Sequence, residues 1–267
     1  MLSKGRSVNQ VTSQGGDVGE HGRGASRFGL WADPVLVLSL LGLWVALALV
    51  FNGEPEIDRW VSSLFFTAKP CAQGSQALVC GGFPAGANVV LAAIRSFFHY
   101  LPVVVAVVVL AILARDLAAG RRFNDGRVRF TFTALAALII GPGLIVNVFL
   151  KEYWGLPRPA STDLYGGTLP FVPAGEWSGA CPDNCSFVSG EASSIFWLVC
   201  LIPLWPKHQR GMAAVVICTI AVLTAALRVA FGGHYISDVV LGGLSTLIVF
   251  ATLAALAERA YDVSRQG

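Results

Sequence analysis

The sequence predicts an all-α membrane protein, a polytopic helical bundle of about six transmembrane helices with both termini in the cytoplasm. Three observations predict this class: the composition, the length of the apolar blocks and the placement of the basic residues. Hydrophobic residues make up 55% of the 267 positions, and charged residues make up 13%. Soluble domains carry about 25% charged residues, so the composition argues against a soluble protein.

The apolar residues gather in six blocks, each long enough to cross a hydrocarbon core of about 30 Å. The blocks cover residues 34–51, 98–114, 130–150, 187–205, 212–231 and 236–257. We expect one transmembrane domain over residues 31–260. Residues 1–30 are polar, rich in Gly and Ser, and lack the apolar stretch of a signal peptide. Their composition predicts a disordered cytoplasmic tail.

Basic residues distinguish the two ends of the predicted bundle. Most of them lie before the first block, between the second and third, between the fourth and fifth, or after the sixth: Lys4, Arg6, Arg23, Arg27, Arg115, Arg121, Arg122, Arg127, Arg129, Lys207, Arg210, Arg259 and Arg265. The positive-inside rule assigns these segments to the cytoplasm. The two long links, residues 52–97 and 151–186, then face outward.

Four cysteines lie in these outer links. An oxidising space stabilises disulfides, and the spacing predicts two short local bridges, Cys71–Cys80 and Cys181–Cys185. The alternative is a metal site made from the four thiolates. Cys200 and Cys218 stand inside apolar blocks, where we expect them to pack as small apolar side chains.

Polar residues collect at the outer ends of the third to sixth blocks, where a charge needs a functional reason. They are Lys151, Arg158, Ser189, Gly190, Glu191, Arg228, His234 and Asp238. Three cations at one depth repel one another unless an anion lies between them. Phosphate is the natural candidate, because Arg binds it with two parallel hydrogen bonds and Lys binds it as a point charge. The start of the fourth helix adds free backbone amides.

His234 is the candidate nucleophile of this site. Asp238 follows it by one helical turn, where a carboxylate can orient an imidazole and stabilise its charged form. Each residue alone also fits a structural role: Lys151 and Arg158 as interfacial anchors and Arg228 as a snorkelling side chain. These separate roles would have to assemble every part of a phosphate site at one depth by chance, so we favour the phosphate site.

The spacing of these residues resembles the three-part signature of the type 2 phosphatidic acid phosphatase superfamily. The first motif is KEYWGLPRP, the second is VSGE and the third is RVAFGGHYISD. The resemblance covers roughly residues 98–257. It implies a six-span lipid phosphatase in a bacterial inner membrane that needs no metal or other cofactor and binds no nucleic acid. Its active site would face the periplasm, and its partner would be a phosphorylated membrane lipid.

The resemblance also implies a role for each residue. Lys151, Arg158 and Arg228 would hold the phosphate, Ser189 and the Gly190 amide would complete its cradle, His234 would form a phospho-histidine that water hydrolyses, and Asp238 would support His234.

The sequence departs from the family pattern in the second and third motifs. The second usually reads Pro-Ser-Gly-His, whereas here Val188 and Glu191 replace the outer two residues, and Leu227 replaces the Ser before Arg228. The family His protonates the leaving alcohol, and we expect Glu191 to take that role. A carboxyl can do so only if its pKa lies well above about 4.3. The alternatives are a leaving group that needs little protonation and a structural ion pair for Glu191.

The resemblance leaves several lipid substrates open. They are lipid A phosphates, undecaprenyl diphosphate, phosphatidylglycerol phosphate and phosphatidic acid. Residues 160–186 form a long aromatic link that could cover a sugar headgroup, which favours lipid A. The link could instead only pack on the bundle. Two other functions remain: a lipid phosphotransferase, and a non-enzymatic lipid-binding protein or transporter, for which Pro142 inside the third block is a weak sign.

Overall fold

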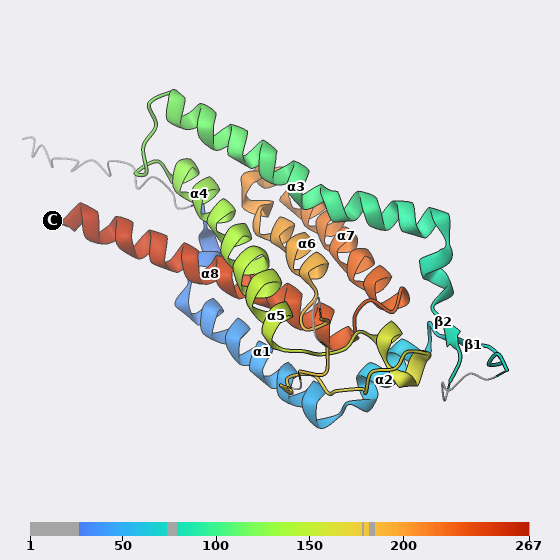
Figure 1. The fold of residues 1–267 in the computed structure, drawn as a ribbon. Coiled ribbons are helices and arrows are strands. Elements are labelled where there is room, and N and C mark those ends of the chain that lie inside the picture. Colours follow the sequence, from blue (N-terminus) through green and yellow to red (C-terminus); the bar gives the residue numbers. More distant parts are fainter. Residues whose placement is uncertain (1–26, 74–78, 178, 182–184, 267) are drawn as a thin grey trace, which may run out of the picture.

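The structure, a computed structural model, is a bundle of long helices with a small hairpin at one end (Figure 1). It describes residues 27–73, 79–177, 179–181 and 185–266. Its helices are α1 (Pro34–Gly53), α2 (Glu56–Ser63), α3 (Val89–Ala118), α4 (Gly126–Leu138), the π-helix η3 (Ile139–Leu150), α5 (Lys151–Tyr153), α6 (Gly190–Cys200), α7 (Arg210–Ala230) and α8 (Ile236–Gln266). Strands β1 (Thr67–Ala68) and β2 (Gly81–Gly82) pair antiparallel. Short 3₁₀ helices are η1 (Gly29–Ala32), η2 (Pro84–Ala87), η4 (Pro159–Ser161), η5 (Asp163–Tyr165), η6 (Ile202–Leu204) and η7 (Lys207–Gln209).

Five helical stretches of the described chain are long and apolar enough to cross a membrane: Pro34–Gly53, Val89–Ala118, Gly126–Leu150, Lys207–Ala230 and Ile236–Gln266. They match five of the six predicted blocks. The fourth block forms a shorter apolar helix, Gly190–Leu204. The second helix starts nine residues before the predicted block, and Arg95 therefore lies inside a helix rather than in the outer link.

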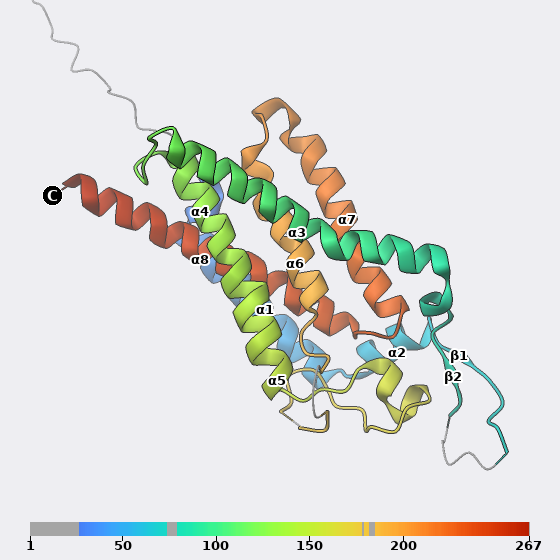
Figure 2. The same ribbon diagram turned by 45° about the horizontal axis from the view of Figure 1, so that its top comes forward.

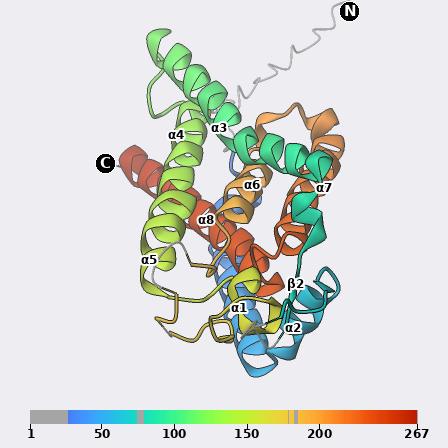
Figure 3. The same cartoon turned by 45° about the vertical axis from the view of Figure 1, so that its right-hand side comes forward.

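Helix α6 is short because it lies inside the bundle. It packs against α3, α4, α7 and α8 (Figure 3). The side chains of Ile195 and Trp197 are fully buried, and the indole N–H of Trp197 donates to the Ala134 carbonyl at 2.7 Å. By contrast, α1, α3 and α7 expose many large apolar side chains, as helices that face lipid do.

Side-chain caps determine where several helices begin. The N-cap residues Asp33, Asn88, Asp125 and Ser189 each accept a hydrogen bond from a backbone amide in the first turn of α1, α3, α4 and α6. Such caps satisfy amides that have no partner within the helix. The cap at Ser189 sets the start of α6, where the predicted residues Ser189, Gly190 and Glu191 lie.

The first described residues pack on the helical bundle. Residues 1–26 lie outside the described part of the chain, but Phe28 is 1% exposed and packs against Phe130 and Phe250. Trp31 also contacts Phe250, edge to face. These aromatic rings bury apolar surface between α4 and α8, so Phe28 is part of the hydrophobic core. The disordered tail over residues 1–30 stays a prediction, because most of it lies outside the described residues.

The two ends of the bundle differ in character (Figures 1 and 2). One end holds α2, the β1–β2 hairpin, α5 and the segment that joins α7 to α8. The other holds the α3–α4 and α6–α7 connections and the C-terminus. The described members of the predicted cytoplasmic basic set belong to segments at this second end, opposite the long links.

Both predicted disulfides are present in the long links, Cys71–Cys80 and Cys181–Cys185. The second bridge lies in the link between α5 and α6, which packs on the bundle through Leu156, Val172 and Phe187. Cys200 is buried in the core as expected, whereas Cys218 is exposed on α7. The described residues contain no group of three or more His, Cys, Asp and Glu side chains that could hold a metal.

Candidate active site

His234 lies in the turn between α7 and α8 and is 1% exposed. Gly232 has φ of +63°, a left-handed conformation that Gly adopts without strain. At Gly233 an added Cβ would lie 2.7 Å from Nη2 of Arg228. The two glycines thus let the turn close tightly over Arg228 and bring the imidazole beside that guanidinium.

The His234 ring has two polar neighbours on its Nδ1 side. Nδ1 lies 3.3 Å from the Ser186 hydroxyl oxygen and 3.6 Å from Oδ2 of Asp238. The Ser186 hydroxyl donates to Asp238 Oδ2, which also accepts from the Tyr235 amide at 2.9 Å. Asp238 is therefore beside His234 as the one-turn spacing predicts, but the hydroxyl of Ser186 bridges the two side chains.

Ser186 is a site residue that the sequence reasoning missed. It is fully buried, and its amide donates to the Leu156 carbonyl at 2.7 Å. It precedes the second motif by two residues and lies 48 positions from His234 in the chain. No spacing rule connects such distant residues, so no signal in the sequence identifies it.

The three predicted cations all act on His234. Burial lowers the pKa of His234 well below its ordinary value of 6.5, and the neighbouring charges of Arg228, Lys151 and Arg158 lower it further. The turn that follows Arg158 is also tied to the histidine turn, because the Ala160 amide donates to the Gly232 carbonyl at 3.0 Å. The imidazole is therefore neutral, with a lone pair free for attack on phosphorus.

The second motif forms the start of α6. The Ser189 side chain accepts from the Ala192 amide at 3.3 Å, and the Ser189 amide donates to the Asp238 carbonyl at 3.0 Å. Gly190 lies directly against the side chain of Asn147, so that a Cβ there would overlap the Asn147 amide oxygen. The backbone at Gly190 therefore passes closer to η3 than any other residue would permit.

Glu191 has two arginine partners. Its carboxylate accepts two hydrogen bonds from Arg95 of α3, one of them at 3.2 Å from Nε, and lies 3.5 Å from Nη1 of Arg228. Nδ1 of His99, also on α3, is 3.8 Å from the same carboxylate. The sequence reasoning missed both α3 residues. Their signal was an Arg and a His four residues apart, which face one side of a helix.

A cavity of about 320 Å³ opens at this cluster. The residues that line it include His99 on α3, Asn147 on η3, Lys151 on α5, and Gly190 and Glu191 on α6. Of the three predicted cations, Lys151 lines this cavity, and Arg228 lies 3.5 Å from Glu191 in its wall. The cavity is therefore a space beside the cluster that a phosphorylated headgroup could enter.

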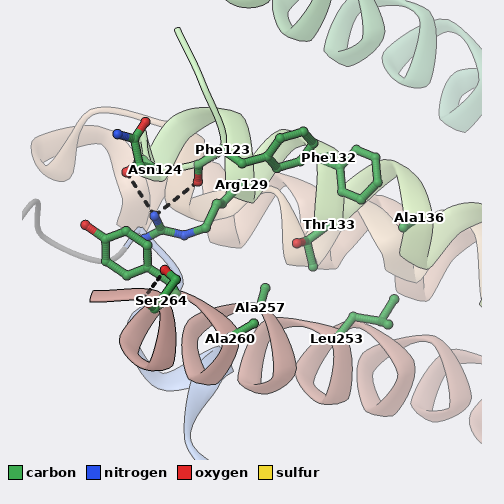
Figure 4. Close-up of a pocket in the computed structure, with 11 residues that line it drawn as sticks. Phe123, Asn124, Arg129, Phe132, Thr133, Ala136, Leu253, Ala257, Ala260 and Ser264 are labelled. Atoms are coloured by element: carbon green, nitrogen blue, oxygen red, sulfur yellow. Dashed lines mark hydrogen bonds between the residues drawn. The ribbon is translucent and has the colours of Figure 1, made fainter. Parts of the chain in front are cut away.

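A second cavity, of about 390 Å³, lies at the opposite end between α4 and α8 (Figure 4). There Arg129 donates to the carbonyls of Phe123 and Asn124 and pairs with Glu258 at 3.1 Å. The guanidinium also lies 3.7 Å from the Tyr261 ring centroid. Arg129 thus links α4 to α8 through its ion pair with Glu258. None of the predicted site residues lines this cavity.

Asp58, in α2, forms hydrogen bonds with the first turn of α8, which follows His234. It is 1% exposed, and its carboxylate accepts from the amide of Ser237 at 2.9 Å and from its hydroxyl at 2.6 Å. Burial raises the pKa of Asp58 to about 7, although the Ser237 hydrogen bonds oppose this shift. Asp58 thereby holds the first turn of α8, between His234 and Asp238, and the sequence reasoning did not identify it.

Comparisons with known proteins agree with this geometry. Residues 130–261 match the family model of the PAP2 superfamily. A lipid A 4'-phosphatase of Rhizobium leguminosarum is 47% identical over 221 residues, which cover 82% of this chain and 95% of that protein. The enzyme of the same name in Rhizobium etli is 45% identical over 239 residues, 85% of this chain and 93% of that protein.

A solved structure has the same fold. It is the transmembrane PAP2-type phosphatidylglycerolphosphate phosphatase of Bacillus subtilis, with a TM-score of 0.50 and 19% sequence identity. The match covers 84% of this chain and 96% of that one.

Proposed function

This chain belongs to the PAP2 superfamily, and we propose that it removes the 4'-phosphate from lipid A at the outer face of a bacterial inner membrane. It is a multi-span membrane phosphatase, as the family match, the helical fold and the Rhizobium relatives indicate. The observation that carries the proposal is the gathering of Lys151, Arg158 and Arg228 around the buried imidazole of His234.

The names of the relatives support the choice of lipid. Two Rhizobium proteins that share almost half of their residues with this chain are lipid A 4'-phosphatases. The long link between α5 and α6 is consistent with a large headgroup, since Trp177 in it is 61% exposed while Trp154, which contacts it, is partly buried. The exposed ring of Trp177 in this link offers a surface on which a sugar can stack.

The outward orientation rests on charge. The basic connections lie at the end of the bundle opposite the site, and such connections remain in the cytoplasm. The two disulfides belong to the site end, where an oxidising space stabilises them. The phosphate of an outer-leaflet lipid then reaches the site without leaving the membrane surface.

We assign binding of the phosphate to the three cations. Lys151, Arg158 and Arg228 neutralise its charge, and Arg228 presents its guanidinium from the last turn of α7. The amides at the start of α6, at Gly190, add hydrogen-bond donors and the positive end of a helix dipole. These groups bind the negative charge that spreads over the equatorial oxygens in the transition state.

His234 is the nucleophile in this mechanism. Nδ1 faces Ser186 and Asp238, which leaves Nε2 to attack phosphorus. The P–O bond to the sugar breaks as the P–N bond forms, and the sugar oxygen takes a proton. The phosphorylated imidazole carries a positive charge, which the Asp238 carboxylate stabilises through the Ser186 hydroxyl. Water then attacks phosphorus, the P–N bond breaks, and inorganic phosphate and neutral His234 are released.

The proposal is tested with purified protein, a chelator and a panel of lipids. The panel contains lipid A with phosphates at both ends, phosphatidylglycerol phosphate, phosphatidic acid and undecaprenyl diphosphate. We expect the fastest phosphate release from lipid A, with mass spectrometry showing loss at the 4' position. Faster release from another lipid would refute the substrate. Loss of activity with EDTA that magnesium restores would refute the metal-free mechanism.

A further inference from the structure

The sugar oxygen that leaves in the first step needs a proton. An alkoxide is a poor leaving group, and a positioned acid typically accelerates such a step by about 10²–10⁴-fold. The acid must line the cavity that receives the headgroup. The polar residues in that lining are His99, Asn147, Lys151, Glu191 and Ser194. An amide and a hydroxyl are very weak acids, so three of these residues remain.

Glu191 is poorly suited to donate this proton. Both of its oxygens accept hydrogen bonds from Arg95, and the Arg228 guanidinium lies 3.5 Å away. Two cations beside a carboxylate favour its ionised form. An ionised carboxylate accepts hydrogen bonds only. Glu191 is thus a fixed negative charge at the wall of the cavity, able to orient a neighbouring donor.

His99 is the donor next to that charge. Its Nδ1 lies 3.8 Å from Oε1 of Glu191, and its side chain is 49% exposed. It follows Arg95 by four residues on α3, so both side chains project toward α6, which α3 crosses in Figure 2. Imidazole is the side chain whose ordinary pKa lies closest to neutrality, which suits an acid that must also accept a proton back.

We propose that His99 is the general acid that protonates the leaving sugar oxygen, oriented by the Glu191 carboxylate. This inference rests on the proposed function and adds a catalytic residue to it. The acid is supplied by α3, outside the three motifs, and Glu191 becomes a positioning residue in place of the acid that the second motif alone led us to expect.

The proton balance follows directly. As Nε2 of His234 bonds to phosphorus, the P–O bond to the sugar breaks, and the Nε2 proton of His99 passes to the sugar oxygen. The sugar leaves as an alcohol, and His99 is left neutral. When water attacks the phospho-histidine, its proton passes to Nε2 of His99. The acid is then ready for the next turnover.

Lys151 is the other proton donor in the cavity. It acts on His234 together with Arg158 and Arg228, which places it with the cations that bind the phosphate oxygens. His99 instead lies on the α3 wall of the cavity, 3.8 Å from Oε1 of Glu191, and it is not among the cations that act on His234. The leaving oxygen points away from the nucleophile in an in-line displacement, toward a group that does not hold the phosphate itself.

A substrate with sulfur in place of the bridging 4' oxygen tests this assignment. A thiol is a much stronger acid than an alcohol, with a pKa near 8.5, so a thiolate leaves without a proton. We expect His99→Gln and His99→Asn to lower the turnover number on ordinary lipid A by about 10²-fold or more. On the sulfur analogue they should stay within about threefold of the unchanged enzyme. Glu191→Gln should show the same selective loss.

His208→Gln is the matched control, because His208 is exposed and belongs to the connection at the opposite end. It should behave as the unchanged enzyme on both substrates. Equal losses of His99→Gln on both substrates, or full activity on ordinary lipid A, would overturn the proposal. The proposal would also be overturned if Lys151→Met lost activity on ordinary lipid A but kept it on the sulfur analogue.

Failure of the proposed function looks different. In that case the unchanged enzyme would release no phosphate from lipid A. The comparison of an oxygen-bridged with a sulfur-bridged substrate would then be made on the lipid that the panel identifies.

Discussion

The hydroxyl oxygen of Ser186 lies 3.3 Å from Nδ1 of His234, on the path between the imidazole and the Asp238 carboxylate. The direct separation of Nδ1 and Oδ2 is 3.6 Å, longer than a hydrogen bond. A three-membered chain therefore orients the nucleophile: Nδ1–H donates to the serine oxygen, and the serine hydroxyl donates to the carboxylate.

Removal of this bridge should slow the chemical step. We expect Ser186→Ala to lower the turnover number about tenfold, the effect of losing one net hydrogen bond in the transition state, while KM changes little. Ser193→Ala is the control, because Ser193 is equally buried and bonded to Thr246 but does not contact His234. Steady-state kinetics on both variants decide the matter, and equal losses would mean that only stability had changed.

The nucleophile itself can be trapped. A rapid acid-free quench of the enzyme with radiolabelled lipid phosphate should leave label on the protein, stable in alkali and lost in acid as expected of phospho-histidine. His234→Ala should release no phosphate and take up no label, because His234 is the residue that we assign as nucleophile beside the three cations. His208→Ala should label normally. Turnover by His234→Ala, with a folded protein, would remove the basis of the mechanism.

The tight turn before His234 should be sensitive to a single methyl group. At Gly233 a Cβ would lie 2.7 Å from Nη2 and 2.9 Å from Cζ of Arg228, so Gly233→Ala must displace a guanidinium that we assign to the phosphate. Loss of a charge-assisted hydrogen bond is worth about 1.5–3 kcal/mol, and we therefore expect kcat/KM to fall by roughly 10–100-fold.

The control for this turn is Gly211→Ala, where an added Cβ meets nothing within 4 Å. It should leave both kcat/KM and the melting temperature nearly unchanged. If Gly233→Ala also kept full kcat/KM, Arg228 would not be needed in its observed position.

Asp58 predicts a pH dependence of stability. Burial raises its pKa from 3.8 to about 7 in the folded protein, so between these two values the folded state binds a proton that the unfolded state has lost. The contribution of Asp58 is then fully present below pH 3.8 and is lost as pH rises through about 7. Stability should fall between pH 5 and pH 8, and Asp58→Asn should reduce that fall.

Thermal unfolding in detergent at the two pH values measures the effect. The relevant quantity is the drop in Tm from pH 5 to pH 8 in the unchanged protein minus the drop in Asp58→Asn. Asp163→Asn, in the link between α5 and α6, is the control and should show the same drop in Tm as the unchanged protein. A drop that is the same in all three proteins would show that Asp58 is not the group responsible.

Much of the fold followed from one-dimensional patterns. Apolar blocks predicted the long helices because a membrane requires about 20 apolar residues per span. The same rule placed the start of the second helix too late, because the charged Arg95 interrupts the apolar run. Arg95 nevertheless lies in α3, where it and His99 contact Glu191. The fourth block became a short helix because α6 is enclosed by other helices and does not have to match the bilayer.

The candidate site divides in the same way. The distances from Arg228 to His234 and from His234 to Asp238 are set by one turn and one helical repeat, so their proximity could be predicted from spacing. The partners of Glu191 on α3, Arg95 and His99, could not be predicted from spacing. They come from α3, 96 positions away for Arg95, and only the packing of α3 on α6 brings them together.

By itself the sequence determined the class of protein. It also predicted one end of the bundle as the place of the chemistry, and the cations and imidazole that we propose recognise a phosphate. These properties depend on hydropathy, charge and short helical spacings, which act locally along the chain. Only the tertiary structure decided that Ser186 bridges His234 and Asp238, that Asp58 holds the start of α8, and that His99 stands beside Glu191. Those contacts join residues that no local rule relates, because they arise when separate helices bury their surfaces against one another.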